Sequence, residues 1–195
     1  MSVMGVKWFL SWILMFPLLK LLTGVVVSGS VPKKGPLIIA SNHTSFLDPP
    51  VLGTVVCREV YFLAKPGLFK VSKFFTWLIK TYNALSLEGT EGLRRAIRLI
   101  KQGKAVVIFP EGTRSKKGVL LPFQSGVGYL AINLNVPVIP VYIKNSNKNI
   151  FSLVFRLNKL TVKIGKPIYP YGYKKSRQDF ERFTVRLRNA VEELI

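Results

Sequence analysis

Residues 37–48 of the chain read Leu-Ile-Ile-Ala-Ser-Asn-His-Thr-Ser-Phe-Leu-Asp, an apolar run followed by a polar turn. The run at residues 37–40 has the length of a buried strand, and its isoleucines favour extended backbone. Similar runs follow at residues 60–64, 84–87, 105–109, 138–143 and 160–164. Helical patterns lie at residues 66–81, 90–102, 124–134 and from 176 to the C-terminus. This alternation predicts a single α/β domain with a mostly parallel central sheet flanked by helices.

The charge of the chain points to an anionic partner. In 195 residues, a length that suits one domain, 29 Lys and Arg face 9 Asp and Glu, a net charge of +20. Nucleic acid and an anionic membrane surface both attract such a charge. Several aromatic residues lie in apolar runs or near the N-terminus rather than among lysines, which favours the membrane over nucleic acid. A basic module that binds nucleic acid or membrane without catalysis is the alternative from a different class.

The cysteine and histidine counts limit the cofactors. The chain has one cysteine, Cys57, and one histidine, His43. A lone cysteine excludes an intramolecular disulfide and cannot build a thiolate metal site, which fits a reducing compartment. We therefore expect neither a metal nor another cofactor.

The N-terminal segment is apolar enough to contact a membrane. Residues 8–27 carry a single charge, Lys20, and twenty helical residues match a hydrocarbon core. Pro17 should kink such a helix, and a lysine at bilayer depth costs about 2.5 to 3.5 kcal/mol, so a shallow anchor and a full span are both open. A cleaved signal peptide is the rival reading. We expect residues 1–30 to anchor the protein at the cytoplasmic face of the cell membrane and residues 31–195 to form the folded domain.

The histidine lies where the first apolar run ends. His43 follows Asn42 and stands five residues before Asp48. Imidazole acts as a base near neutral pH, and a carboxylate on its other nitrogen fixes the tautomer. If residues 44–48 form one tight turn, Asp48 reaches back to the ring. The alternative is that the two polar neighbours only cap the turn and the next helix, which the following two prolines would start.

A second polar loop follows the run at residues 105–109. Its sequence is Phe-Pro-Glu-Gly-Thr-Arg-Ser, residues 109–115. Because the carboxyl ends of parallel strands meet at one edge of a sheet, this loop and the histidine turn can face each other. Arg114 offers a planar fork for phosphate, Glu111 accepts hydrogen bonds from hydroxyls, and Gly112 lets the backbone approach a ligand. The alternative is a polar hairpin without a chemical role.

Together these segments resemble the glycerolipid acyltransferase superfamily, and most closely the 1-acyl-sn-glycerol-3-phosphate acyltransferases of the PlsC type. The first motif of that family is Asn-His, four residues and Asp, and it is matched by Asn42, His43 and Asp48. The third motif is matched in full by residues 109–115, and the apolar fourth motif resembles residues 138–141.

The second motif of the family is matched only in part. Ala64 and Lys65 match this motif. The family usually has an arginine after the strand, but the corresponding position here is near Glu88 or Gly89, and neither is an arginine. The basic residues that could replace it are Arg94, Arg95 and Lys80.

The resemblance implies transfer of a fatty acyl group from a thioester, acyl-CoA or acyl carrier protein, to the sn-2 hydroxyl of lysophosphatidic acid, giving phosphatidic acid. His43 would be the catalytic base and Asp48 its partner. The resemblance implies that substrate is bound by Asn42, Lys65, Glu111, Gly112, Thr113 and Arg114. Acylation of glycerol-3-phosphate or of another lysophospholipid is the alternative with the same motifs.

Residues 66–81 mix aromatic with basic side chains. Phe74, Phe75 and Trp77 lie among lysines in this segment. This composition is typical of a helix that lies at a membrane interface. Since the acyl chain of the acceptor lies in the bilayer, we expect the active site to open toward the membrane here. A buried core helix whose lysines reach out to water is the alternative.

Overall fold

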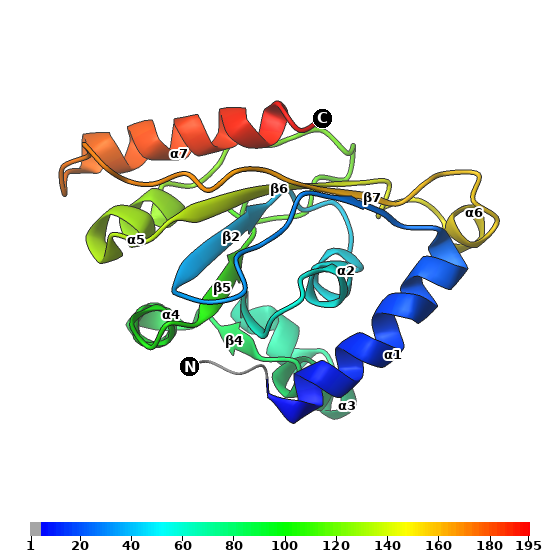
Figure 1. The fold of residues 1–195 in the computed structure, drawn as a ribbon. Helices are drawn as coiled ribbons and strands as arrows, with labels where there is room; N and C mark the ends of the chain where they lie inside the picture. The colour runs from blue at the N-terminus through cyan, green and yellow to red at the C-terminus, as the bar shows by residue number, and fades with distance from the viewer. Residues whose placement is uncertain (1–4) are drawn as a thin grey trace.

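The computed structural model describes residues 5–195 and contains a central sheet with the strand order β1-β7-β6-β2-β5-β3-β4 (Figure 1). The strands are β1 (Val26–Ser28), β2 (Leu37–Ser41), β3 (Val60–Ala64), β4 (Ala84–Ser86), β5 (Ala105–Ile108), β6 (Val138–Lys144) and β7 (Thr161–Ile164). Within this part of the chain every neighbouring pair is parallel except β6 and β7. The predicted mostly parallel α/β sheet is therefore confirmed, and all six predicted strands agree with the structure to within one residue at each end.

Helices cover both faces of the sheet (Figure 1). They are α1 (Val6–Thr23), α2 (Asp48–Val55), the 3-10 helix η1 (Pro66–Lys70), α3 (Lys73–Thr81), α4 (Gly89–Lys101), α5 (Gly126–Leu134), α6 (Ile150–Val154) and α7 (Arg177–Glu192). Successive side chains of a strand point to opposite faces, so Leu37 and Ile39 join a core with α1, α2 and α6, whereas Ile38 and Ala40 join one with α4, α5 and α7. Because β2 is buried on both faces, its sequence is an uninterrupted apolar run at residues 37–40.

The N-terminal segment contributes more to the domain than its sequence predicted. The expected helix over residues 8–27 ends at Thr23, because Gly24 takes a left-handed conformation with φ of 62°. The β-branched residues that follow form β1, which pairs in parallel with β7. Trp8 and Val25 are buried in the core. Residues 1–30 thus supply a sheet strand, and none of the helices in residues 5–195 is long and apolar enough to cross a bilayer.

The segment expected as one helix over residues 66–81 consists of two. Pro66 begins η1, and the hydroxyl of Ser72 caps α3 by accepting a hydrogen bond from the Phe75 N–H at 3.1 Å. None of the residues of η1 and α3 is buried, and Phe74 and Trp77 are 71% and 61% exposed. The alternative of a buried core helix is therefore wrong.

The strand directions determine what meets at the edge where the central strands end. Because β2, β3, β5 and β6 are mutually parallel, the segments that follow each of them leave from this one edge. Strand β7 runs in the opposite direction and β1 is parallel to β7, so the C-terminal end of α1 also reaches this edge. The turn after β2, the loop after β5, η1, α6 and the end of α1 consequently all lie along this edge of the sheet.

Candidate active site

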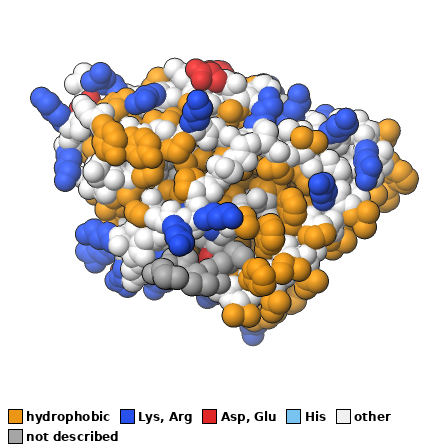
Figure 2. All heavy atoms as spheres, viewed as in Figure 1, with side chains coloured by type: hydrophobic (Ala, Val, Ile, Leu, Met, Phe, Trp, Pro, Cys, Tyr) orange, Lys and Arg blue, Asp and Glu red, His pale blue; other side chains and the backbone are white. Residues whose placement is uncertain are grey.

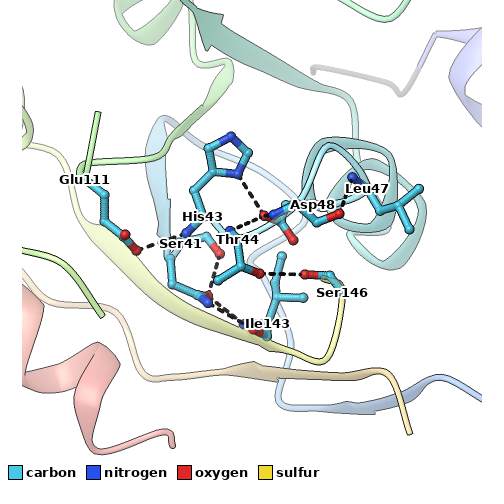
Figure 3. A network of polar contacts seen from close by, with 10 residues as sticks. Ser41, His43, Thr44, Leu47, Asp48, Glu111, Ile143 and Ser146 are labelled. Carbon is cyan, nitrogen blue, oxygen red and sulfur yellow. Dashed lines mark hydrogen bonds and ion pairs between the residues drawn. The ribbon is translucent and has the colours of Figure 1, made fainter. Parts of the chain in front are cut away.

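The turn after β2 holds the histidine against a buried carboxylate. The Nδ1 atom of His43 lies 2.7 Å from Oδ2 of Asp48, the first residue of α2 (Figure 3). The same oxygen accepts hydrogen bonds from the backbone N–H groups of Thr44 and Ser45 at 2.7 and 2.8 Å. The Asp48 side chain is fully buried. The expected contact between Asp48 and the imidazole is therefore present, and Asp48 also begins the helix that follows the turn.

The contacts of the imidazole determine which nitrogen is available for chemistry. A carboxylate only accepts, so the Asp48 contact places the ring proton on Nδ1 and leaves Nε2 with its lone pair. The ring stacks on Phe109, with centroids 4.2 Å apart and planes 25° from parallel. The His43 side chain is still 18% exposed. An oriented, partly exposed imidazole with Nε2 as the proton acceptor is the geometry of a general base.

The turn and the loop of residues 109–115 are bound directly to each other. The His43 N–H donates to Oε1 of Glu111 at 3.0 Å (Figure 3). The His43 carbonyl accepts from the Ser115 N–H at 2.7 Å. The guanidinium of Arg114 lies 3.5 Å above the ring of Phe46, in the middle of the turn. The two segments, which were expected to face each other, are thus in direct contact in the structure.

The carboxyl of Glu111 is an unusual acid because of its surroundings. Burial raises its pKa to about 7, against hydrogen bonds from the His43 and Leu121 N–H groups that lower it. The Asp48 charge raises the pKa further and the Arg188 guanidinium on α7 lowers it, both by smaller amounts. Glu111 therefore titrates near neutral pH, at a position where its side chain joins the two segments.

Asn42 binds the turn to the neighbouring strand β6. Its side-chain amide donates to the Ile143 carbonyl at 2.9 Å and accepts from the Ile143 N–H at 2.7 Å, and the residue is 2% exposed. Beside it, the Thr44 and Ser146 hydroxyls lie 2.9 Å apart. Two side chains of the turn thus bind the end of β6 and the residue two positions after it, and this fixes the turn to the sheet.

The remaining predicted residues lie at the same edge. Gly112 has φ of 66°, a conformation that strains any other residue, and an added Cβ would also displace the side-chain amide of Gln124. Thr113 and Arg114 are exposed beside it. Lys65 is exposed directly beyond β3. These side chains are open to a ligand, unlike those of Asn42 and Glu111.

Several contributors to the site were not singled out in the sequence. Phe109, Ser115 and Phe46 lie inside the recognised motifs, so their positions were a usable signal. Ser146 lies 102 residues after its partner and only the fold brings it there. Of the residues considered as replacements in the second motif, Arg95 pairs with Glu91 on the surface of α4.

A separate hollow lies outside this site. This hollow of about 1000 Å³ runs along α7 and is lined by residues such as Pro140, Gly165 and Arg186, none of which belongs to the turn or the loop. Among the described residues, no three His, Cys, Asp or Glu side chains come together as a metal site.

Comparisons with known proteins identify relatives. The profile of the Acyltransferase family matches residues 24–144. The chloroplastic 1-acyl-sn-glycerol-3-phosphate acyltransferase of Brassica napus is 33% identical over 143 residues, which cover 69% of this chain and 41% of that protein. The 1-acyl-sn-glycerol-3-phosphate acyltransferase of Bacillus subtilis is 25% identical over 172 residues, 85% of this chain and 84% of that protein. The chain spans only about two fifths of the length of some of these relatives, such as the Brassica protein.

A solved structure has the same fold. The crystal structure of the 1-acyl-sn-glycerophosphate (LPA) acyltransferase PlsC from Thermotoga maritima superposes with a TM-score of 0.69 at 27% identity, covering 97% of this chain and 88% of that one. The family match spans β1 to β6 and includes both segments that the fold joins around His43. The chain belongs to the Acyltransferase family.

Proposed function

We propose that the protein transfers a fatty acyl group from an acyl thioester to the sn-2 hydroxyl of 1-acyl-glycerol-3-phosphate, forming phosphatidic acid. The observation that carries this is the His43–Asp48 pair, hydrogen-bonded into the loop that presents Arg114. The relatives from Brassica napus and Bacillus subtilis are both named for this acceptor, which supports the choice of substrate.

The chemistry needs one base and no covalent intermediate. Nε2 of His43 removes the proton of the acceptor hydroxyl as its oxygen attacks the thioester carbonyl carbon. The C–S bond then breaks, the ester forms, and the departing thiolate takes the proton back from Nε2. Asp48 keeps the ring oriented and stabilises the imidazolium that exists between the two proton transfers.

The phosphate of the acceptor has a cation in reach of the base. Arg114 presents its guanidinium on the face of Phe46, within the same turn as His43, and a guanidinium binds phosphate through two parallel hydrogen bonds. Gly112 and Thr113 beside it offer backbone and hydroxyl donors, and Lys65 is a further cation at this edge. We assign Asn42 and Glu111 to positioning the turn, since the contacts of their side chains are with backbone groups of the site.

The donor is acidic in either form that we consider. Acyl-CoA carries phosphates and acyl carrier protein is an acidic protein, so both are attracted to a chain with a net charge of +20. No metal enters the reaction as written, and we expect activity to survive chelation by EDTA.

The surfaces of α1 and α3 suit the membrane in which the acceptor lies. Neither helix contains an acidic residue. Their apolar side chains that are at least 60% exposed are Val6, Leu14, Leu21, Phe74 and Trp77. Exposed apolar side chains beside lysines are typical of a helix lying in the headgroup region of an anionic membrane. The protein would thus work at the membrane surface, on the cytoplasmic face, where anionic lipids and both donors occur.

A transfer assay tests the proposal. Purified protein is given radiolabelled acyl-CoA or acyl carrier protein with lysophosphatidic acid, glycerol-3-phosphate or lysophosphatidylcholine as separate acceptors. We expect phosphatidic acid from the first acceptor and none from His43→Ala, with no change when EDTA is added. Product formation that does not depend on His43, or turnover of a different acceptor alone, would contradict the proposed function.

A further inference from the structure

The connection between β6 and β7 exposes apolar side chains that the domain does not use. Strands β6 and β7 are the antiparallel pair of the sheet, and residues 145–160 between them contain the short helix α6. Phe151, Phe155 and Leu157 are 68%, 72% and 78% exposed, whereas Leu153 is 1% exposed and packs into the core. We call residues 145–160 the α6 segment. Leu153 and Leu160, both 1% exposed, fix this segment to the domain, whereas its most exposed apolar side chains, Phe151, Phe155 and Leu157, point outward.

Hydrogen bonds hold the α6 segment in this shape. The side chain of Asn149 caps α6 by accepting from the Phe151 N–H at 2.9 Å. The Asn158 N–H donates to the Ser152 carbonyl at 3.2 Å, and the Asn145 side chain donates to the Lys159 carbonyl at 2.9 Å. The segment is therefore closed on itself at both ends, and its apolar side chains are presented by an ordered backbone.

Charge around the α6 segment is of one sign. Its exposed apolar side chains are flanked in the sequence by Lys144, Lys148, Arg156 and Lys159, all exposed. The chain contains no Asp or Glu between Glu111 and Asp179. Exposed aromatic side chains surrounded by cations, with no acid among them, complement a surface of anionic headgroups over an apolar interior.

The α6 segment continues the apolar surface of α1. The Arg156 guanidinium donates to the Leu21 carbonyl at 3.3 Å, and its side chain lies against Gly24 at the end of α1. Figure 2 shows hydrophobic side chains gathered along the right and lower right edge of the molecule, over α6 and α1, with basic side chains beside them. The two elements form one surface rather than two separate patches.

The strand directions place this surface beside the chemistry. The α6 segment follows β6 at the edge where β2 ends. Near its start, the hydroxyl of Ser146 is hydrogen-bonded to the hydroxyl of Thr44, in the turn that carries His43, at 2.9 Å. A membrane contact made by this segment would therefore hold the active site at the lipid surface.

We propose that the α6 segment is a membrane-inserting element, in which Phe151, Phe155 and Leu157 enter the headgroup region of an anionic bilayer while the flanking lysines and arginine bind lipid phosphates. The inference rests on the proposed function only for the choice of a membrane as partner. It adds a contact, separate in sequence from α1 and α3, that orients the molecule.

Vesicle binding tests the proposal without any turnover. Purified full-length protein is sedimented with vesicles of phosphatidylcholine containing anionic phosphatidylglycerol, and with phosphatidylcholine alone. The double variant Phe155→Ser/Leu157→Ser should bind the anionic vesicles about tenfold more weakly than the wild type, because two side chains lose their apolar burial. The matched control Val185→Ser/Ile195→Ser removes two side chains that are 59% and 54% exposed on α7 and at the C-terminus, and should bind as the wild type does.

A local probe gives an independent readout. In a Cys57→Ala background, Leu157→Cys carries an environment-sensitive thiol dye whose emission should shift to the blue with anionic vesicles, while Val185→Cys stays unshifted. Equal vesicle binding of the double variant and a silent probe would overturn the proposal. A change of oligomeric state with unchanged vesicle binding would show instead that a second copy of the chain covers the segment. Failure of the proposed function is distinguished by the transfer assay with a short-chain, water-dispersed acceptor, in which both double variants should match the wild type.

Discussion

Two regions of the molecule are built in opposite ways. The His43 turn comprises residues 42–48, and the apolar rim comprises the exposed apolar side chains of α1, α3 and the α6 segment. In the turn, side chains make hydrogen bonds within the protein. One oxygen of Asp48 accepts from two backbone N–H groups and from the His43 ring, and Asn42 makes two hydrogen bonds to the Ile143 backbone. In the rim, the largest side chains are left in contact with solvent. The turn therefore uses its polar groups internally to fix one geometry, whereas the rim has apolar area available for a partner.

This difference teaches that catalysis and membrane contact should be separable by substitution. A change in the turn alters the position or protonation of one ring and leaves the rim intact. A change in the rim removes apolar area and leaves the hydrogen bonds of the turn intact. Each substitution below is expected to affect one of these regions and not the other.

The largest effect is expected for His43→Ala. Loss of the base should lower kcat by about a thousandfold or more, since no other imidazole exists in the chain. The rate is measured as phosphatidic acid formed, and vesicle binding serves as the control that should not change. Retention of most of the activity would mean that the base is another group.

Asp48→Asn should follow, with kcat lowered by between about a hundredfold and ten-thousandfold. The asparagine Oδ1 can take the place of the carboxylate oxygen that accepts from the Thr44 and Ser45 N–H groups and from Nδ1. It carries no negative charge, so the imidazolium formed during the transfer loses its anionic partner. A loss of activity that matches an equal loss of folded protein would instead make the role of Asp48 purely structural.

Glu111→Gln tests the stability of the link between turn and loop. Because the pKa of Glu111 is about 7 in the folded protein and 4.5 ordinarily, the native state binds more protons than the unfolded state between these values. This group therefore makes the wild type less stable as pH rises from about 4.5 to 7. Glutamine keeps an acceptor for the His43 N–H but does not titrate. The free energy of unfolding of the variant, relative to that of the wild type, should therefore increase by up to about 3 kcal/mol as pH rises over this range. Denaturant unfolding at pH 5 and pH 8 measures this, and a constant difference between the two proteins would contradict it.

Arg114→Ala should act mainly on binding. We expect the KM for lysophosphatidic acid to rise about tenfold with a smaller change in kcat, because a charge-assisted contact with the phosphate is lost. Lys117→Ala, an exposed cation three residues further on, is the matched control. An unchanged KM in the Arg114 variant would exclude its phosphate role.

The smallest effect on chemistry is expected in the rim. Phe74→Ser/Trp77→Ser on α3 should weaken binding to anionic vesicles by about fivefold and leave turnover of a water-dispersed short-chain acceptor unchanged. Both side chains are exposed, so the free energy of unfolding should change by less than about 0.5 kcal/mol. Turnover of the short-chain acceptor that falls together with vesicle binding would show that the two regions are coupled.

How much of the site the sequence predicted follows from the range of each interaction. The His43–Asp48 contact spans five residues and could be inferred from a tight turn, and the seven-residue loop was recognisable as a block. The assignment of Asn42 to substrate could not be refined, because its partner Ile143 lies 101 residues away. Likewise, the burial that raises the pKa of Glu111 exists only once the turn has docked on the loop.

The same distinction holds for the fold. Apolar runs and helical periods are local properties, so the sequence by itself determined the alternation of strands and helices, the two motif segments and the excess of positive charge. The tertiary structure alone decided that β1 joins the sheet beside β7, that β7 is antiparallel to β6, and that the α6 segment lies beside the His43 turn. These features depend on which distant apolar faces and backbone edges pair when the chain packs, and a short β-branched segment such as Val26–Ser28 acquires its role only from the partner strand that meets it.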